Sequence, residues 1–201
     1  MTVTRATTEK RPWFVKVSQL FPRQGEWTER DYFGLPETNR IVELTDGVLI
    51  MPPHPTDTHQ TVALRLVLTL HGFVTAHNLG EVRFAPLPVN LWPGKVREPD
   101  VLFLTQAHAD RRGERAWGPP DLVMEVVSPG TEGLDRETKP AEYAQAGIAE
   151  YWIVDPHGRS IEVWGLEGDA YVLVGKFGKG QTARSQLLSG FEVLVDSIFE
   201  G

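Results

Sequence analysis

Acidic side chains interrupt two apolar segments of this chain. Asp100 follows Pro99 and precedes Val-Leu-Phe-Leu, and Glu125 lies within Leu-Val-Met-Glu-Val-Val. Both segments are typical of strands, so the two carboxylates would lose water on folding, which is costly unless a cation compensates. Adjacent strands can bring two such residues to one edge of a sheet. There Asp100 and Glu125 would share one Mg²⁺ or Mn²⁺, ions that prefer oxygen ligands.

A divalent ion held in this way favours phosphoester hydrolysis. It polarises a phosphoryl oxygen and lowers the pKa of a bound water, so that a nucleophile forms at neutral pH. A nearby lysine would orient that water or stabilise charge in the transition state. The simpler alternative is that Asp100 caps a turn and Glu125 pairs with an arginine at a strand end. The apolar residues on both sides of Glu125 favour the metal, because they leave this side chain no solvated face.

Turn-forming and apolar residues predict the elements that would position these carboxylates. A short capped helix is expected from Thr28 to Phe33, and a hairpin around Asp46-Gly47. A long helix, capped by Asp57 or Thr58, is expected to reach His77, and a short one to run from Pro140 to Gly147. The remaining expected elements are strands at 81–91, 99–104, 121–128 and 150–154, a helix or loop at 106–115, and several short strands within 160–199.

The long helix is predicted to be mostly buried. Apolar residues recur at helical spacing along it and leave a narrow polar stripe of Thr61, Arg65, Thr69 and Gly72. Part of so wide an apolar face would pack against a second subunit, which predicts a homodimer. The fold class is therefore α/β (α+β), with a mixed β-sheet flanked by one long and one short helix and with additional β-hairpins. Residues 1–27 are expected to form an N-terminal extension, and 28–201 a single domain.

Composition narrows the classes of function. The 201 residues include no cysteine, which excludes disulfides and zinc–thiolate sites. We expect a cytoplasmic protein, since the N-terminus lacks a secretory pattern and no apolar segment reaches the length of a membrane span. The net charge of −7 argues against tight non-specific nucleic-acid binding, although Arg111, Arg112 and Arg115 can form a local basic patch.

A longer pattern of motifs resembles a known family. Pro99-Asp100 is followed by Glu125-Val-Val-Ser-Pro, by Asp135-x-x-x-Lys139, and by Tyr143-Ala-x-Ala-Gly-Ile-x-Glu-Tyr-Trp-Ile-Val-Asp-Pro. Together with the hairpin and the start of the long helix, these motifs resemble the Uma-two family of restriction-endonuclease-like proteins. That family has been treated as a domain of unknown function within the PD-(D/E)xK nuclease superfamily. The resemblance covers roughly residues 28–199.

The resemblance implies a role for each matched position. Asp100 and Glu125 would be metal ligands, with Glu43 as a third acidic ligand. The superfamily lysine usually lies two residues after the second acidic residue, where this chain has Val127, and Lys139 is the match in the following helix. Pro140 disfavours helical geometry at Lys139, which places the lysine at the mouth of the helix. His59 would contact substrate or a metal-bound water.

Simpler roles stay open for three of these residues. The simpler role for Lys139 is an exposed ion pair with Asp135. Glu43 could satisfy backbone or arginine donors instead of binding a metal. His59 could be a capping or surface residue.

The resemblance implies a metal-dependent endonuclease that uses Mg²⁺ or Mn²⁺ and metal-activated water to hydrolyse DNA phosphodiester bonds. The acidic net charge and the valine at position 127 support an alternative, a catalytically inactive nuclease-fold module for binding or dimerisation. A third interpretation is a hydrolase of small phosphate esters with oxygen ligands to its metal.

Overall fold

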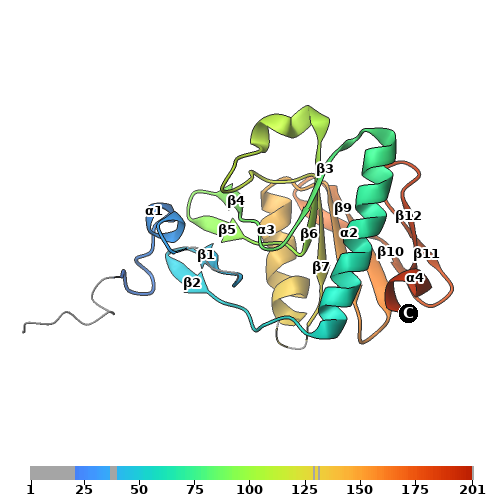
Figure 1. The fold of residues 1–201 in the computed structure, drawn as a ribbon, viewed down its shortest axis with the longest axis horizontal. Coiled ribbons are helices and arrows are strands. Elements are labelled where there is room, and N and C mark those ends of the chain that lie inside the picture. The colour runs from blue at the N-terminus through green and yellow to red at the C-terminus, as the bar shows by residue number, and fades with distance from the viewer. Residues whose placement is uncertain (1–20, 37–39, 129, 131, 201) are drawn as a thin grey trace, which may run out of the picture.

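A six-stranded mixed sheet forms the centre of the molecule (Figure 1). The computed structural model describes residues 21–36, 40–128, 130 and 132–200. The strand order is β10-β9-β8-β7-β6-β3, and only β7 and β8 are parallel neighbours. Helix α3 lies on the crossover between these two strands, a connection that parallel neighbours require. The strands are β3 (Gly80–Phe84), β6 (Val101–Thr105), β7 (Leu122–Val126), β8 (Glu150–Asp155), β9 (Ser160–Glu167) and β10 (Ala170–Phe177).

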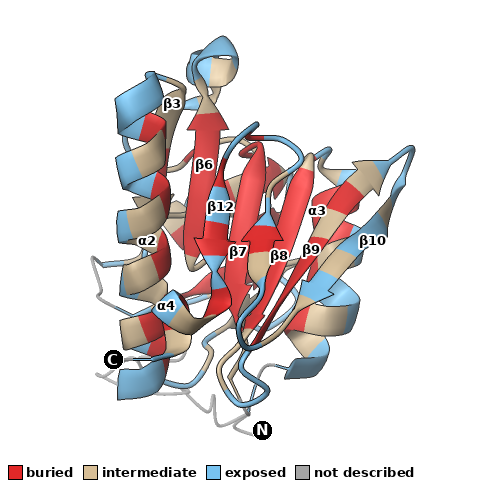
Figure 2. Ribbon diagram, turned by 90° about the vertical axis from the view of Figure 1, so that its right-hand side faces the viewer, coloured by how far each residue is buried: buried red, intermediate tan, exposed pale blue. Residues whose placement is uncertain are grey.

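The two faces of this sheet are covered by different helices. Helices α2 (Asp57–His77) and α4 (Val195–Phe199) pack on one face, and α3 (Lys139–Gln145) lies on the other. Alternate residues of β7 serve the two cores, since Met124 packs with the α2 side and Val123 with the α3 side. Strands β6, β7 and β8 are buried along nearly their whole length (Figure 2), which explains why their sequences are continuously apolar.

Two smaller sheets accompany the central one in the described residues. One has the order β2-β1-β5-β4 and lies beside α1 (Glu29–Phe33), away from α2 (Figure 1). Its strands are β1 (Glu43–Thr45), β2 (Val48–Ile50), β4 (Val89–Trp92) and β5 (Lys95–Arg97). The other pairs β11 (Thr182–Arg184) with β12 (Glu192–Leu194). A 3-10 helix, η2 (Gln106–Arg111), follows β6.

The N-terminal helix and hairpin are confirmed. Thr28 caps α1, and its side chain and that of Asp31 bond each other's backbone N–H groups in a capping box. The hairpin turns at Asp46 and Gly47, both with positive φ, as its two-residue turn requires. The single strand expected at 81–91 is wrong, because β3 and β4 belong to different sheets and the cis bond Ala85–Pro86 lies between them.

Helix α2 has the expected length, but its buried face is narrower than expected and its exposed face differs from the predicted one. Its cap is Thr56, whose hydroxyl accepts the N–H of His59, rather than Asp57 or Thr58. The buried residues Val62, Leu66, Leu70 and Val74 follow the predicted stripe. However, Leu64 and Leu68 are 57% and 63% exposed, while Arg65 and Thr69 are half-buried. Arg65 donates to the carbonyl of Ile198 in α4, a tertiary contact that rotates the expected polar stripe inward.

The helix that carries Lys139 begins earlier than expected. A π turn, η3 (Leu134–Thr138), leads directly into α3, and Lys139 has helical torsion angles of −60° and −40°. The prediction that Pro140 keeps Lys139 at the mouth of the helix is therefore wrong. The N–H of Lys139 bonds to the carbonyl of Leu134, five residues back. We infer that this wider turn accommodates the proline ring, which in a regular α-helix would clash with the carbonyl four residues earlier.

The predicted fold class is confirmed by this mixed sheet with one long helix and one short helix. Of the expected N-terminal extension, 1–27, residues 1–20 lie outside the described residues. Within the part of the chain that the structure describes, no helix combines the length and apolar character that crossing a membrane requires.

Candidate active site

All five residues singled out from the sequence line one small cavity. It measures about 50 Å³ and is bordered by Glu43 of β1, His59 of α2, Asp100, Glu125 of β7 and Lys139 of α3. These elements come from both faces of the main sheet and from the β2-β1-β5-β4 sheet, which we call the small sheet. The cavity lies where the sheets meet, and every one of these side chains except that of Asp100 belongs to a buried residue. The fold therefore gathers residues that span almost a hundred positions of the sequence.

Asp100 is fixed by one backbone and one side-chain contact. Strands β6 and β7 pair with Val101 opposite Met124, so Asp100 and Glu125 occupy the same end of the strand pair. The Oδ2 atom of Asp100 accepts the N–H of Val126 at 2.8 Å and lies 3.1 Å from Nε2 of His59. His59 is thus a buried partner of Asp100 rather than a surface residue. Burial lowers the pKa of His59, but the hydrogen bond and charge of Asp100 outweigh it and raise that pKa overall.

Glu125 and Asp135 hold the ammonium group of Lys139 between them. The Nζ atom lies 2.9 Å from Oε1 of Glu125 and 2.8 Å from Oδ1 of Asp135. The hydroxyl of Tyr143, one turn further along α3, donates to the same Oε1 atom at 2.6 Å. The ion pair of Lys139 with Asp135 was considered as an exposed contact. It is instead buried, with these two side chains 8% and 3% exposed.

The pKa values of Glu125 and Lys139 are both raised in this cluster, but by different causes. Burial raises the pKa of Glu125 to about 8, with Lys139 acting in the opposite direction and Asp100 and Asp135 adding to the rise. Burial lowers the pKa of Lys139, but the carboxylates around it, Glu125 first, raise that pKa above its ordinary value. Both shifts mean that the cluster keeps its protons to higher pH than the isolated groups would.

Glu43 faces the same cavity but belongs to a second set of buried charges. Arg97 donates to Oε2 of Glu43 at 2.7 Å and forms a two-pronged pair with Glu142 of α3, at 2.7 and 2.9 Å. Lys95 adds a contact to Glu142 at 3.0 Å. We call Glu43, Lys95, Arg97 and Glu142 the Arg97 cluster. It joins the small sheet to the helix that carries Lys139, and it fulfils the arginine-pairing role considered for Glu43.

Comparison with known proteins assigns the chain to a family. A family model described as "putative restriction endonuclease", named Uma2, matches residues 30–196. The chain belongs to the Uma2 family. A crystal structure titled as a putative nuclease belonging to DUF820, from Anabaena variabilis, superposes with a TM-score of 0.72. It shares 17% sequence identity, and the match covers 86% of this chain and 97% of that chain, which shows a common fold. No curated protein matches this chain.

Three residues of the Uma2 site were not identified from the sequence. Asp135 was considered only as an ion-pair partner of Lys139, Tyr143 was noted only as part of a motif, and Glu98 was given no role. Tyr143 is four residues after Lys139 on a helix, a spacing that places both side chains on one face. Burial raises the pKa of Glu98 to about 7, and within the described residues its Oε2 atom is buried without a hydrogen bond.

The Uma2 site offers oxygen ligands but no complete set of metal ligands. In residues 21–36, 40–128, 130 and 132–200, no three His, Asp or Glu side chains are arranged to hold an ion. The bonds to Asp100 all reach Oδ2 and those to Glu125 all reach Oε1, so each carboxylate has a second oxygen that makes no hydrogen bond within these residues. Two carboxylates fit Mg²⁺, which commonly completes its shell with water and substrate phosphates.

Proposed function

We propose that this chain is a metal-dependent endonuclease that hydrolyses DNA phosphodiester bonds. The observation that carries the proposal is the convergence of Asp100, Glu125 and Lys139 on one cavity in a chain of the Uma2 family. Asp100, Glu125 and Asp135 outnumber the lysine that contacts two of them, and His59 adds a second positive charge only when it is protonated. The cavity therefore favours an additional positive charge. Mg²⁺ or Mn²⁺ bound there would lower the pKa of a water and polarise the scissile phosphate.

The residues of the chain have separable roles in this proposal. Asp100 and Glu125 would hold the ion, and His59 holds Asp100 in place through its contact with the Oδ2 atom. Lys139 remains an ammonium group at neutral pH because its pKa is raised. It therefore donates hydrogen bonds to the phosphate, and stabilises the charge that develops there, rather than accepting a proton. Glu43, with Arg97 on its Oε2 atom, supplies negative charge to the cavity from the side of the small sheet.

A nicking assay with matched variants tests the proposal. Supercoiled plasmid and labelled oligonucleotides are incubated with Mg²⁺ or Mn²⁺ and with wild type, Asp100→Asn, Glu125→Gln or Lys139→Met. We expect metal-dependent cleavage in the wild type and at least a hundredfold loss in each variant, about the size of removing one electrostatic group from an active site. The control is Glu192→Gln, which removes an exposed carboxylate of β12. Cleavage by Glu125→Gln at the wild-type rate would contradict the proposal.

A catalytically inactive binding module is the second candidate, and one observation favours it. Lys139 already neutralises Glu125 and Asp135 at hydrogen-bonding distance in a cavity of about 50 Å³. The exposed Leu64 and Leu68 of α2 would then serve the homodimer that this candidate includes. Light scattering on a sizing column measures the dimer. Calorimetry with Mg²⁺ separates the two candidates. An inactive module should show no heat of Mg²⁺ binding that is present in the wild type and lost in Glu125→Gln.

A further inference from the structure

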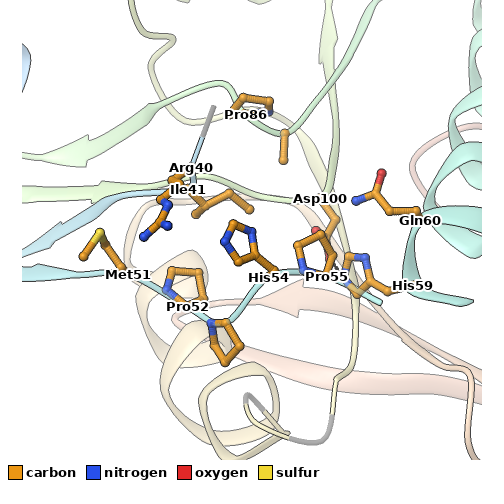
Figure 3. Close-up of a pocket in the computed structure, with 12 residues that line it drawn as sticks. Arg40, Ile41, Met51, Pro52, His54, Pro55, His59, Gln60, Pro86 and Asp100 are labelled. Atoms are coloured by element: carbon orange, nitrogen blue, oxygen red, sulfur yellow. Dashed lines mark hydrogen bonds and ion pairs between the residues drawn. The ribbon is translucent and has the colours of Figure 1, made fainter. Parts of the chain in front are cut away.

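A second and much larger cavity opens beside the carboxylate site (Figure 3). Its volume is about 510 Å³, within the range of roughly 300–1,000 Å³ that is typical of small-molecule sites. His59 and Asp100 belong to the walls of both cavities, as do Pro52, Pro53 and Pro55. The large cavity is therefore continuous with the residues proposed to hold the metal, and a molecule bound in it would lie next to the scissile phosphate.

The walls of this cavity combine flat apolar groups with a few polar ones. Pro52, Pro55 and Pro86 present their rings, and Ile41 and Met51 extend the apolar surface. In Figure 3 the imidazole of His54 lies between Pro52 and Pro55, while Gln60 and the guanidinium of Arg40 lie at opposite sides of the cavity. Ring surfaces with one amide and one imidazole suit a planar heterocycle that carries hydrogen-bonding edges. A cation in the same wall suits a phosphate.

We propose that this cavity binds one unstacked nucleotide of the DNA strand that the neighbouring carboxylates cleave. The inference rests on the proposed endonuclease function and deepens it by naming the state of the substrate. A base inside a duplex is covered by its neighbours and cannot enter a pocket beside its own phosphate. The nucleotide must come from a single strand or be flipped out of a duplex. The net charge of −7 agrees with this choice, since it disfavours long contacts along a duplex backbone.

Anisotropy with short labelled DNA tests the cavity separately from cleavage. A single strand, a duplex of the same sequence and that duplex with one unpaired central base are titrated in Ca²⁺ instead of Mg²⁺. We expect the single strand or the unpaired duplex to bind at least about tenfold more tightly than the perfect duplex, which corresponds to one stacked base. Tighter binding of the single strand identifies a single-strand substrate. Tighter binding of the duplex with an unpaired base identifies a flipped nucleotide. Equal affinity for all three would overturn the proposal.

A variant that fills the cavity makes the test specific. Gln60 is exposed on α2 and lines the cavity, so Gln60→Trp would occupy its space without disturbing the core. The matched control is Thr75→Trp, exposed near the other end of the same helix. We expect Gln60→Trp to lose about tenfold in affinity for the preferred DNA, and Thr75→Trp to lose none.

The two proposals fail in different ways. Metal-dependent cleavage of perfect duplex by Gln60→Trp at the wild-type rate would overturn the nucleotide site and leave the endonuclease intact. Preferential binding of unpaired DNA that Gln60→Trp abolishes, without cleavage by any form of the protein, would support the nucleotide site and contradict the endonuclease.

Discussion

Two clusters of buried charge meet at α3, and they differ in their balance. The Arg97 cluster has two cations, Arg97 and Lys95, for the two acids Glu43 and Glu142. The cluster around Lys139 has one lysine for three acids, Asp100, Glu125 and Asp135, and His59 adds a second positive charge only when it is protonated. Burial acts on Glu142 and Glu125 in the same direction, yet their pKa values shift oppositely. Arg97 and Lys95 lower the pKa of Glu142, while Lys139 does not prevent the pKa of Glu125 from rising to about 8.

This difference separates a structural set of charges from a site that can take a ligand. In the Arg97 cluster the guanidinium donates two bonds to Glu142 and one to Glu43, so the charges satisfy one another. In the Lys139 cluster, Asp100 and Glu125 each keep an oxygen without a hydrogen bond within the described residues. Fold stability should therefore depend on the first cluster and cation binding on the second.

The largest expected effect comes from removing the central cation of the balanced cluster. Arg97→Met leaves Glu43 and Glu142 buried without their main partner, which costs about 3–5 kcal/mol for a buried pair. Urea denaturation followed by fluorescence measures this loss. The control is Arg184→Met, which removes an exposed pair with Glu192 worth less than about 1 kcal/mol. A loss below about 1 kcal/mol for Arg97→Met would show that the cluster does not hold the small sheet to α3.

A pair of carboxylate-to-amide variants separates stability from metal binding. We expect Glu125→Gln to weaken Mg²⁺ binding at least about tenfold, because tenfold is the lower end of what losing even an outer-shell partner of a ligand costs. Glu125→Gln should be at least as stable as the wild type near neutral pH without metal, since the cluster has excess acid and the amide removes a buried carboxylate whose pKa is raised. Glu142→Gln should do the reverse, because it breaks buried pairs without touching the ligands. Calorimetry and urea denaturation measure the two effects. Loss of Mg²⁺ affinity in Glu142→Gln alone would reverse the assignment of the clusters.

The same two variants should respond to pH with opposite sign in EDTA. The pKa of Glu142 is lowered in the folded protein, so its stabilisation is present above about 4.5 and is lost as pH falls below that value. Wild type and Glu142→Gln should therefore converge in acid. The pKa of Glu125 is raised, so its contribution is full below about 4.5 and is lost as pH rises to about 8. Glu125→Gln should gain stability relative to wild type over that interval. Parallel pH curves for the two variants would contradict the contrast.

The smallest effect is expected from one hydroxyl. Tyr143→Phe removes the hydrogen bond to Oε1 of Glu125 and leaves the ring in place, which costs about 1.5–3 kcal/mol for a bond to a charged group. Lys139 still contacts the same oxygen, so the low end of that range applies. Thermal unfolding measures this loss of stability. The control is Tyr171→Phe, which removes a hydroxyl that donates to a backbone carbonyl. No difference from the wild type would show that Lys139 alone holds Glu125.

Local sequence predicted most of the elements, and together with the family resemblance it named residues that the fold brings to one cavity. It did not predict how the charges of these residues are shared. The hairpin, the capped helix at Thr28 and the buried stripe of α2 depend on neighbours in the chain, and they are confirmed. Arg97 and Glu142 are 45 residues apart, and nothing near either residue indicates the other. The outward turn of Leu64 and Leu68 also had no local signal, because α4 supplies the carbonyl that draws Arg65 inward.

The π turn before Lys139 has a consequence for aligning relatives of this chain. A π turn adds one residue to a helix without adding a full turn, so it can be gained or lost by a single insertion or deletion. A relative without it could carry its lysine one position closer to the acidic strand in sequence and yet place the ammonium at the same point in space. Column-by-column matching would then score a retained lysine as missing. Superposition of the ammonium positions, rather than residue spacing, is the appropriate criterion for this helix.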